Sequence, residues 1–243
     1  MSDMLQTIPL LKLMIAFIPV LFVVAIIWKW QLGYKNSIYA ISRMLVQLLL
    51  IGYVLAYIFE TDSSVVVIAV LTVMLFSSSW IALTSINLPK KTLLSKSFTS
   101  IFVSGSFVLL VISQCVLVLN PWYKASVIIP LAGMVFASAM NSVSLAGERL
   151  KAELDRSVEY DQARNIAMRA SLIPITNSLL AVGLVSLPGM MTGQILAGVS
   201  PLIAARYQIM VMCMLFGAAG IASALFLVLV KPYFKNNNLI GPL

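Results

Sequence analysis

Long apolar runs separated by short polar gaps occupy almost the whole of this chain. Most of the runs are close to the length, about 20 residues, that an α-helix needs to cross the hydrocarbon core of a bilayer. A membrane-spanning β-barrel would instead show short segments in which polar and apolar residues alternate. The runs cover residues 10–28, 38–59, 65–86, 98–119, 127–146, 171–187 and 202–230. We therefore predict an all-α integral membrane protein with about seven transmembrane helices.

Composition supports this class and excludes others. Hydrophobic residues make up 61% of the chain and charged residues only 10%, which is too apolar for a single water-soluble domain. The formal net charge is +8, a balance that in a soluble protein would suggest nucleic acid as a partner. Here the basic residues cluster at the ends of the apolar runs, where they set orientation. We expect the lipid bilayer, and no nucleic acid, to be the partner of these surfaces.

The distribution of basic residues predicts the orientation of the chain in the membrane. The gaps after the first, third and fifth runs, together with the C-terminal tail, hold twelve of the sixteen Lys and Arg residues. Because cytoplasmic loops carry an excess of these residues, we predict an outside N-terminus and a cytoplasmic C-terminus. Residues 1–235 are predicted to form a single transmembrane domain, and residues 236–243 a disordered tail.

The segment 147–170 is the one polar element of any size. It holds five basic and five acidic side chains, and Arg149 with Glu153, like Lys151 with Asp155, has the i,i+4 spacing of helical ion pairs. Two apolar stripes out of phase with each other predict two helical pieces with a bend near Tyr160. By pattern alone a solvated amphipathic connector is favoured over a docking element for a cytoplasmic partner.

The sequence Leu187-Pro188-Gly189 interrupts the apolar pattern between the last two runs. Pro lacks an amide donor and Gly tolerates unusual backbone angles, so the pair stops a helix. Interrupted backbone at membrane depth is tolerated only inside protein or beside a wet cavity. The pair therefore marks either an ordinary loop between two spans or part of a transport pathway. The amides of nearby Asn177, Gln194 and Gln208 could line such a route, or could form hydrogen bonds between helices.

This sequence lacks the residues that several kinds of enzyme chemistry require. No GxxxxGK[ST] loop is present to hold nucleotide phosphates, no histidine exists, and no acidic pair lies within a span. We therefore expect no enzymatic activity and no cofactor bound by this chain. Cys115 and Cys213 lie within apolar runs and are interpreted as small buried residues. A transport function would be driven by a separate partner, or else the chain is a self-sufficient carrier or channel.

Residues 171–208 closely resemble the signature of the FetB-type permeases of ATP-binding-cassette (ABC) transporters, the family UPF0014, which includes plant aluminium-tolerance membrane subunits. The core PGMMTGQIL at 188–196 carries most of the resemblance, and LIP at 172–174, NS at 177–178 and YQI at 207–209 also match. The resemblance implies a multi-pass permease of the bacterial inner membrane that exports iron, or another metal or metal complex. An organic solute such as a nucleotide sugar is the alternative cargo.

The same resemblance implies the partners of the chain. A FetA-like cytoplasmic ATP-binding subunit would hold ATP and Mg, and 147–170 would become the segment that couples it to the permease. A homodimer is expected, because type I permeases form two-subunit pores. Small residues four apart, at Gly189 with Gly193, Ala218 with Ala222 and Gly220 with Ala224, favour close helix contacts either between subunits or within one.

Two sets of site residues follow from this reading. The expected translocation pathway and broken helix comprise Asn177, Ser178, Pro188, Gly189, Met190, Met191, Thr192, Gly193, Gln194, Tyr207 and Gln208. The expected ATPase-coupling residues are Glu148, Arg149, Glu153, Asp155, Arg156, Tyr160, Asp161 and Arg164. Metal ligands are not identified, because the hard cations Fe and Al favour oxygen donors and no carboxylate lies at mid-membrane. Met190 and Met191 would suit Cu(I), although methionine serves more often as a packing residue.

Overall fold

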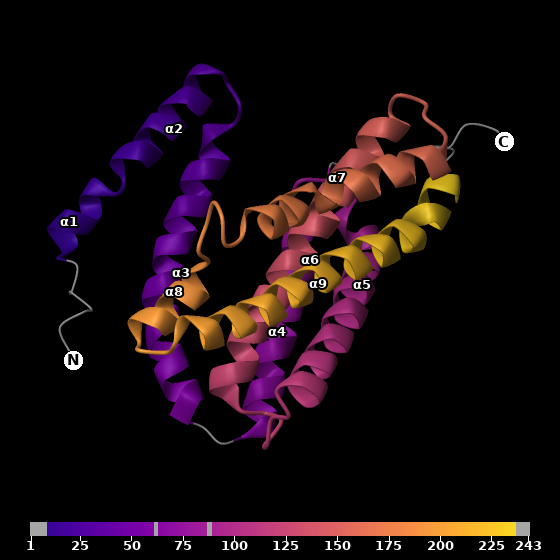
Figure 1. The fold of residues 1–243 in the computed structure, drawn as a ribbon. Coiled ribbons are helices and arrows are strands. Elements are labelled where there is room, and N and C mark those ends of the chain that lie inside the picture. The colour runs from indigo at the N-terminus through magenta and orange to yellow at the C-terminus, as the bar shows by residue number, and fades with distance from the viewer. Residues whose placement is uncertain (1–8, 61–62, 87–88, 237–243) are drawn as a thin grey trace. The chain divides into compact units, whose positions relative to one another are not determined.

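The computed structural model describes residues 9–60, 63–86 and 89–236, and these residues are almost entirely helical (Figure 1). The described residues contain no strand, only one isolated bridge between Val182 and Ser186. The all-α class predicted from the sequence is confirmed. Backbone contacts divide the chain after residue 60 into an N-terminal unit and a larger C-terminal unit.

The N-terminal unit is a helical hairpin preceded by a short helix. Its elements are α1 (Leu10–Ile15), α2 (Ile18–Lys29) and α3 (Tyr34–Glu60). Gln31 and Gly33 adopt positive φ angles of 57° and 78°, which lets the chain reverse between α2 and α3 within a few residues. No residue of α2 is buried, as expected for a helix whose side chains face lipid.

The C-terminal unit is built around two long helices, α6 and α9. Its elements are α4 (Ser64–Ala82), α5 (Lys90–Leu110) continued by the π-helix η1 (Val111–Val116), α6 (Ala125–Leu154), α7 (Tyr160–Ala181), α8 (Gly189–Leu196) and α9 (Pro201–Asn236). Helix α6 contacts α4, α5, α7 and α9, while α9 also contacts α5, α7 and α8. Figure 1 shows α7 and α9 running beside α6 over much of its length.

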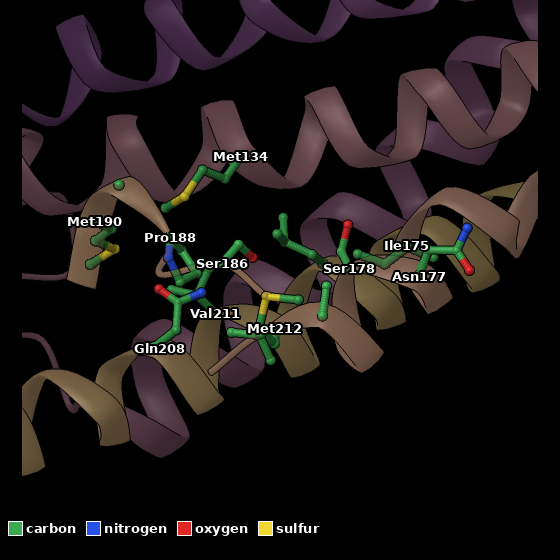
Figure 2. Close-up of a pocket in the computed structure, with 14 residues that line it drawn as sticks. Met134, Ile175, Asn177, Ser178, Ser186, Pro188, Met190, Gln208, Val211 and Met212 are labelled. Carbon is green, nitrogen blue, oxygen red and sulfur yellow. The ribbon is translucent and has the colours of Figure 1, made fainter. Parts of the chain in front are cut away.

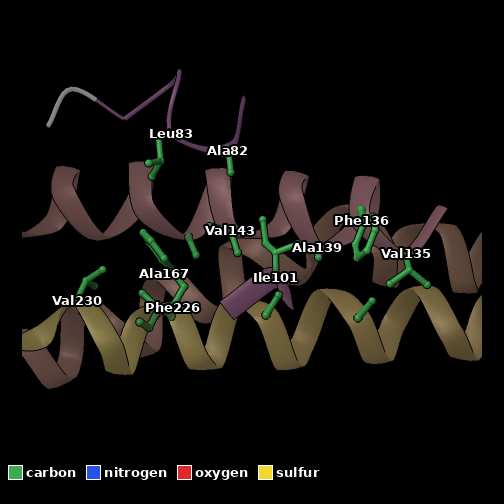
Figure 3. Close-up of a cluster of buried hydrophobic side chains, with 14 of the residues drawn as sticks. Ala82, Leu83, Ile101, Val135, Phe136, Ala139, Val143, Ala167, Phe226 and Val230 are labelled. Carbon is green, nitrogen blue, oxygen red and sulfur yellow. The ribbon is translucent and has the colours of Figure 1, made fainter. Parts of the chain in front are cut away.

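Small residues let the helices of this unit approach closely. Ala139 of α6 and both Ala218 and Ala222 of α9 are completely buried in the core that Figure 3 shows. A Cβ atom added at Gly105 of α5 would lie 2.6 Å from the ring of Phe136 on α6. The spacing of Ala218 and Ala222 is thus explained by packing inside one subunit.

Serine hydroxyls add polar links between these helices. The Ser142 hydroxyl of α6 lies 2.5 Å from the Ser223 hydroxyl of α9, and both side chains are buried. Ser138 donates to the carbonyl of Leu215 at 3.0 Å, which joins the same two helices. Such bonds satisfy polar groups that water cannot reach in a bilayer.

Six helices of the described chain are long and apolar enough to cross a membrane, against about seven spans expected. They comprise residues 12–29, 34–54, 64–82, 90–116, 125–154 and 201–234. The difference is the run 171–187, which does not form a helix of its own. Residues 171–181 of the run are joined to residues 160–170 in α7, whose charged N-terminal half lowers the mean hydropathy of the whole helix.

Helix α9 ends at Asn236, the first residue of the predicted tail, with Pro232 inside its last turns. Residues 237–243 of that predicted tail lie outside the described residues.

Candidate functional site

The chain between α7 and α9 folds into a short turn and a short helix. Helix α7 ends at Ala181, and Gly183 follows with a positive φ of 82° and donates its N–H to the Ser186 carbonyl at 3.0 Å. Pro188 is extended, with φ −62° and ψ 146°, and immediately precedes α8. The interruption expected at Pro188 therefore begins at residue 182, because the positive φ of Gly183 turns the chain there.

This turn forms one wall of a pocket of about 550 Å³ (Figure 2). The other walls come from α6, α7, α8 and α9. The lining residues are Met134, Ile175, Asn177, Ser178, Ala181, Val182, Ser186, Pro188, Gly189, Met190, Gln208, Val211, Met212 and Leu215. Six predicted pathway residues meet here, namely Asn177, Ser178, Pro188, Gly189, Met190 and Gln208. The structure thus brings together residues that lie up to 31 positions apart in the sequence.

Gln208 is the most deeply buried polar residue of this pocket. It is 5% exposed, and its Oε1 atom has no hydrogen-bond partner among the described residues. A buried amide oxygen without a hydrogen-bond partner costs free energy. Ser178, by contrast, donates its hydroxyl to the Pro174 carbonyl at 3.0 Å. The hydroxyl can therefore act toward another group only as a hydrogen-bond acceptor.

Sulfur atoms are the other donors in the pocket. Met134 comes from α6, Met190 from α8 and Met212 from α9, and all three are among the lining residues labelled in Figure 2. No carboxylate lines the pocket, and the described residues hold no cluster of three or more His, Cys, Asp or Glu side chains. The donor set is therefore neutral thioether, amide and hydroxyl.

Two smaller pockets adjoin this one. A pocket of about 310 Å³ shares Ser178 and extends between α6 and α7 past Asn141 and Ser142. A pocket of about 340 Å³ shares Gln208 and Met212 and adds Met191 and Cys213. Both Cys115 and Cys213 are exposed, so the expectation that they are buried is wrong.

Four predicted pathway residues line none of these pockets. Thr192 and Gly193 lie on α8, where the Thr192 hydroxyl donates to the Leu187 carbonyl at 3.5 Å. Gln194 has a buried Oε1 atom without a partner, and Tyr207 is 40% exposed. Met134 of the pocket was not predicted, because it lies in a uniformly apolar run whose sequence gives no sign of which face meets α8.

The polar segment 147–170 is not a separate element. Its first part completes α6, its second part begins α7, and only residues 155–159 form a turn between them. Asp155, Arg156 and Glu159 are exposed in this turn, and Ser157 has a positive φ of 62°. The two helical pieces predicted from the apolar stripes are confirmed, with the bend a few residues earlier than Tyr160.

Ion pairs hold both sides of the turn. Glu153 is buried, with its Oε1 2.6 Å from Arg149 and 3.7 Å from Arg156, and Lys151 pairs with Asp155 at 2.5 Å. Both i,i+4 pairs predicted from the sequence are confirmed. Glu148, on the same helix, is exposed.

A second cluster ties the start of α7 to the end of α9. Asp161 pairs with Arg164 at 2.9 Å and with Lys231 of α9 at 3.2 Å. Tyr160 is 2% exposed and donates its hydroxyl to the Leu227 carbonyl, while the Lys231 ammonium lies 5.3 Å from its ring centroid. Burial raises the pKa of Tyr160 above its ordinary value.

Helix α7 joins the two sets of predicted residues. It begins at the charged turn, ends at the pocket and is 22 residues long. At 1.5 Å per residue this is a rod of about 33 Å. Pro174 lies within this helix, four residues before Ser178 at the pocket wall.

Comparison with known proteins places the chain among membrane proteins. The family model for the uncharacterised protein family UPF0014 matches residues 10–164 and 156–234. The membrane protein slr1647 of Synechocystis, a UPF0014 protein, is 40% identical over 194 residues, which cover 72% of this chain and 73% of that protein. The probable iron export permease protein FetB of Escherichia coli is 33% identical over 223 residues, covering 84% and 83%.

Plant proteins are similar as well. The protein ALUMINUM SENSITIVE 3 of Arabidopsis thaliana is 30% identical over 237 residues, which cover 90% of this chain and 85% of that protein. No solved structure matches the chain.

Proposed function

This chain belongs to the UPF0014 family of membrane proteins, and we propose on that premise that it is the permease subunit of an ABC transporter. It would export iron or another metal, or a metal complex, across the bacterial inner membrane as a homodimer. The similarity to a probable iron export permease supports this cargo class. ATP and Mg would be bound by a separate, FetA-like cytoplasmic subunit.

The observation that carries the proposal is the convergence of six predicted pathway residues on one pocket. Its walls come from four helices and the turn before α8, and each of two further pockets shares lining residues with it. Hydroxyl and amide groups of Ser142, Ser178 and Gln208 line these pockets. A neutral, partly polar route of this kind suits a solute that must leave a hydrated site and cross an apolar barrier.

The charged turn supplies a surface for the ATPase. Residues 155–159 present acidic and basic side chains on an exposed connection between two long helices. The ion pairs behind the turn, with buried Glu153 at their centre, keep the end of α6 rigid. Force applied at the turn would then be transmitted along α6 and α7 rather than absorbed by a flexible loop.

Alternating access follows from this arrangement. Closure of the ATPase dimer would push the turn, and α7 would move against α9 as a rod. The link from Asp161 to Lys231 would act as the pivot, because it joins the two helices beside the turn. Movement of Ser178 and Ala181 at the far end of α7 would open or close the pocket.

Reconstitution tests the proposal. The chain would be co-expressed with a FetA-like ATPase, purified through a tag on the chain, and placed in proteoliposomes. ATP hydrolysis is measured with and without the chain and with Fe(II), Fe(III), Al(III), Cu(I) or a nucleotide sugar added. Stimulation that requires both the chain and a metal supports the proposal. Failure of a correctly folded chain to associate with or stimulate the ATPase would favour a self-sufficient carrier.

Charge reversal at the turn tests the coupling surface. Arg156 is 69% exposed and makes only a 3.7 Å contact, so we expect Arg156→Glu to leave the fold intact. We expect it to abolish stimulated hydrolysis. Lys124→Glu is the matched control, because Lys124 precedes the opposite end of α6. Normal stimulation by Arg156→Glu would remove residues 155–159 from the docking surface.

A further inference from the structure

We propose that one face of α3 binds the headgroup phosphate of an anionic phospholipid through Lys35, Tyr39 and Arg43. The inference concerns the N-terminal unit alone and does not depend on the export function. Arg43 is the deepest of the three contacts, because it lies farthest along the helix from the turn that joins α2 to α3.

Polar side chains form a stripe along the first half of α3. Its members stand four residues apart, so the helix places them on one face, and all are exposed; they are Lys35, Tyr39, Arg43 and Gln47. No residue of the candidate span 34–54 is buried within the protein, so this face is open to the bilayer. Hydrocarbon cannot satisfy polar groups, so the stripe needs a polar partner.

Arg43 is a cation without a counter-charge. It lies nine residues after Tyr34, where α3 begins, which is about 14 Å along the helix axis. Its side chain makes no ion pair and no hydrogen bond with any described residue. The only acidic residue among residues 9–60 is Glu60, at the opposite end of α3. Because the helix faces lipid, phospholipid phosphates are the anions within its reach.

The three side chains suit a phosphate group. The guanidinium of Arg43 can bind two phosphate oxygens at once, and the ammonium of Lys35 adds a second positive charge. Tyr39, which is 66% exposed between them, has a hydroxyl that can donate to a third oxygen. Side chains on a helix lean toward its N-terminus, and the long stem of Arg43 lets its charged end extend from the span toward Tyr39 and the headgroups.

Two tryptophans mark the same end of the hairpin as the headgroup level. Trp28 and Trp30, at the end of α2, are 65% and 67% exposed, and tryptophan is enriched where a bilayer meets water. The headgroup should be anionic rather than zwitterionic. Phosphatidylcholine carries its own ammonium beside the phosphate, which competes with Arg43, whereas phosphatidylglycerol carries none.

Lipid binding to the purified full chain, without any ATPase, tests this inference. The chain in detergent is titrated with phosphatidylglycerol or phosphatidylcholine, and bound lipid is counted by native mass spectrometry. We expect a preference for phosphatidylglycerol. Arg43→Met should weaken phosphatidylglycerol binding about fivefold, the contribution of one basic residue near an anionic surface, and leave phosphatidylcholine binding unchanged. Because this variant removes a charge from a span, it should still insert and fold.

Lys29→Met is the matched control. It removes an equal charge at the same end of the hairpin, but from α2 and outside the stripe, so it should weaken phosphatidylglycerol binding much less than Arg43→Met does. Equal weakening by the two variants would mean a general attraction between basic residues and anionic lipid and would overturn the inference. Absence of a preference for phosphatidylglycerol would also overturn it. So would a protein that copurifies with the wild type but not with Arg43→Met, because a partner helix would then cover the stripe.

Fluorescence quenching tests where the lipid binds. Trp80→Phe combined with Trp122→Phe leaves Trp28 and Trp30 as the only tryptophans in the chain. Phosphatidylglycerol with brominated acyl chains should quench their emission more than brominated phosphatidylcholine does. Adding Arg43→Met should abolish the difference. A difference that persists in Arg43→Met would place the bound lipid away from the stripe and overturn the assignment.

Discussion

Tyr160, the first residue of α7, donates its buried hydroxyl to the main-chain carbonyl of Leu227 on α9. The acceptor is a helical carbonyl four residues before Lys231, whose ammonium lies over the Tyr160 ring. One side chain thus connects the charged turn to the last part of α9 by a hydrogen bond and a cation–π contact. The start of α7 is therefore fixed while its other end borders the pocket.

Removal of this hydroxyl should lower stability. Tyr160→Phe keeps the ring but loses the hydrogen bond, and we expect a cost of about 1–3 kcal/mol. Thermal unfolding in detergent measures the effect. Tyr53→Phe, at a position of α3 that is 83% exposed, serves as the comparison. An unchanged melting temperature in Tyr160→Phe would show that the hydrogen bond makes no net contribution to the stability of the folded protein.

Stability should also depend on pH through this residue. Because burial raises the pKa of Tyr160 in the folded protein, its contribution is complete below the unfolded-state pKa, about 10. As the pH rises above about 10, the unfolded chain loses its proton first and the contribution declines. Melting temperatures from pH 8 to 11 should fall more steeply in the wild type than in Tyr160→Phe. Parallel curves would contradict the assignment.

The Asp161–Lys231 pair should matter for coupling more than for stability. Both side chains are 48% exposed, so the pair is worth about 0–1 kcal/mol. Lys231→Met should leave the melting temperature within a few degrees of the wild type, yet reduce ATPase stimulation severalfold if the pair is the pivot of α7. Asp161→Lys combined with Lys231→Asp should recover part of the stimulation. Full stimulation in Lys231→Met would exclude the pivot role.

Gly105 should not accept even a methyl group. An added Cβ would lie 2.6 Å from the buried ring of Phe136, a rigid group held between helices. Overpacking of this kind costs about 1–3 kcal/mol. Gly220→Ala is the matched control, because a Cβ there meets no atom within 4 Å and should be neutral or stabilising. Unfolding in detergent compares the two variants. A stable Gly105→Ala would mean that the ring moves aside freely.

Hydropathy predicts most of this fold because burial in lipid leaves the backbone few alternatives to a helix. The prediction of helix boundaries is less accurate where a charged segment and an apolar run adjoin. Residues 160–170 are charged and 171–187 apolar, yet they form one helix, since backbone hydrogen bonding continues across a change in polarity. The end of that helix is set by Gly183, whose positive φ was not apparent in a sequence where Pro188 is the stronger helix breaker.

The candidate site was predicted where its residues lie close together in the sequence. Asn177, Ser178 and residues 188–190 share a neighbourhood marked by Pro and Gly, and their convergence follows from the turn. Met134 and Met212 come from long apolar helices, in which a methionine that faces a pocket looks like one that packs in the core. Only the packing of α6 against α9 distinguishes the two cases.

Arg149 and Arg156 should respond differently to the same charge reversal. Both contact Glu153, but Arg149 does so at 2.6 Å and Arg156 at 3.7 Å from an exposed position. Arg149→Glu would place a second carboxylate beside one that is 5% exposed, and a buried carboxylate left without its cation is destabilising. We expect Arg149→Glu to reduce the yield of folded, inserted protein, whereas Arg156→Glu should accumulate normally.

The combination Arg149→Glu with Glu153→Arg tests the cause of that loss. It restores opposite charges at the same i,i+4 spacing, so it should recover much of the folded protein. Size-exclusion profiles of detergent extracts measure folded yield for all three variants. Equal yields for the two single reversals would mean that Glu153 is solvated in the membrane-bound protein, and Arg149 would then become a second residue for the docking test. Unequal yields restrict that test to Arg156, because lost ATPase stimulation in Arg149→Glu would report misfolding rather than lost contact.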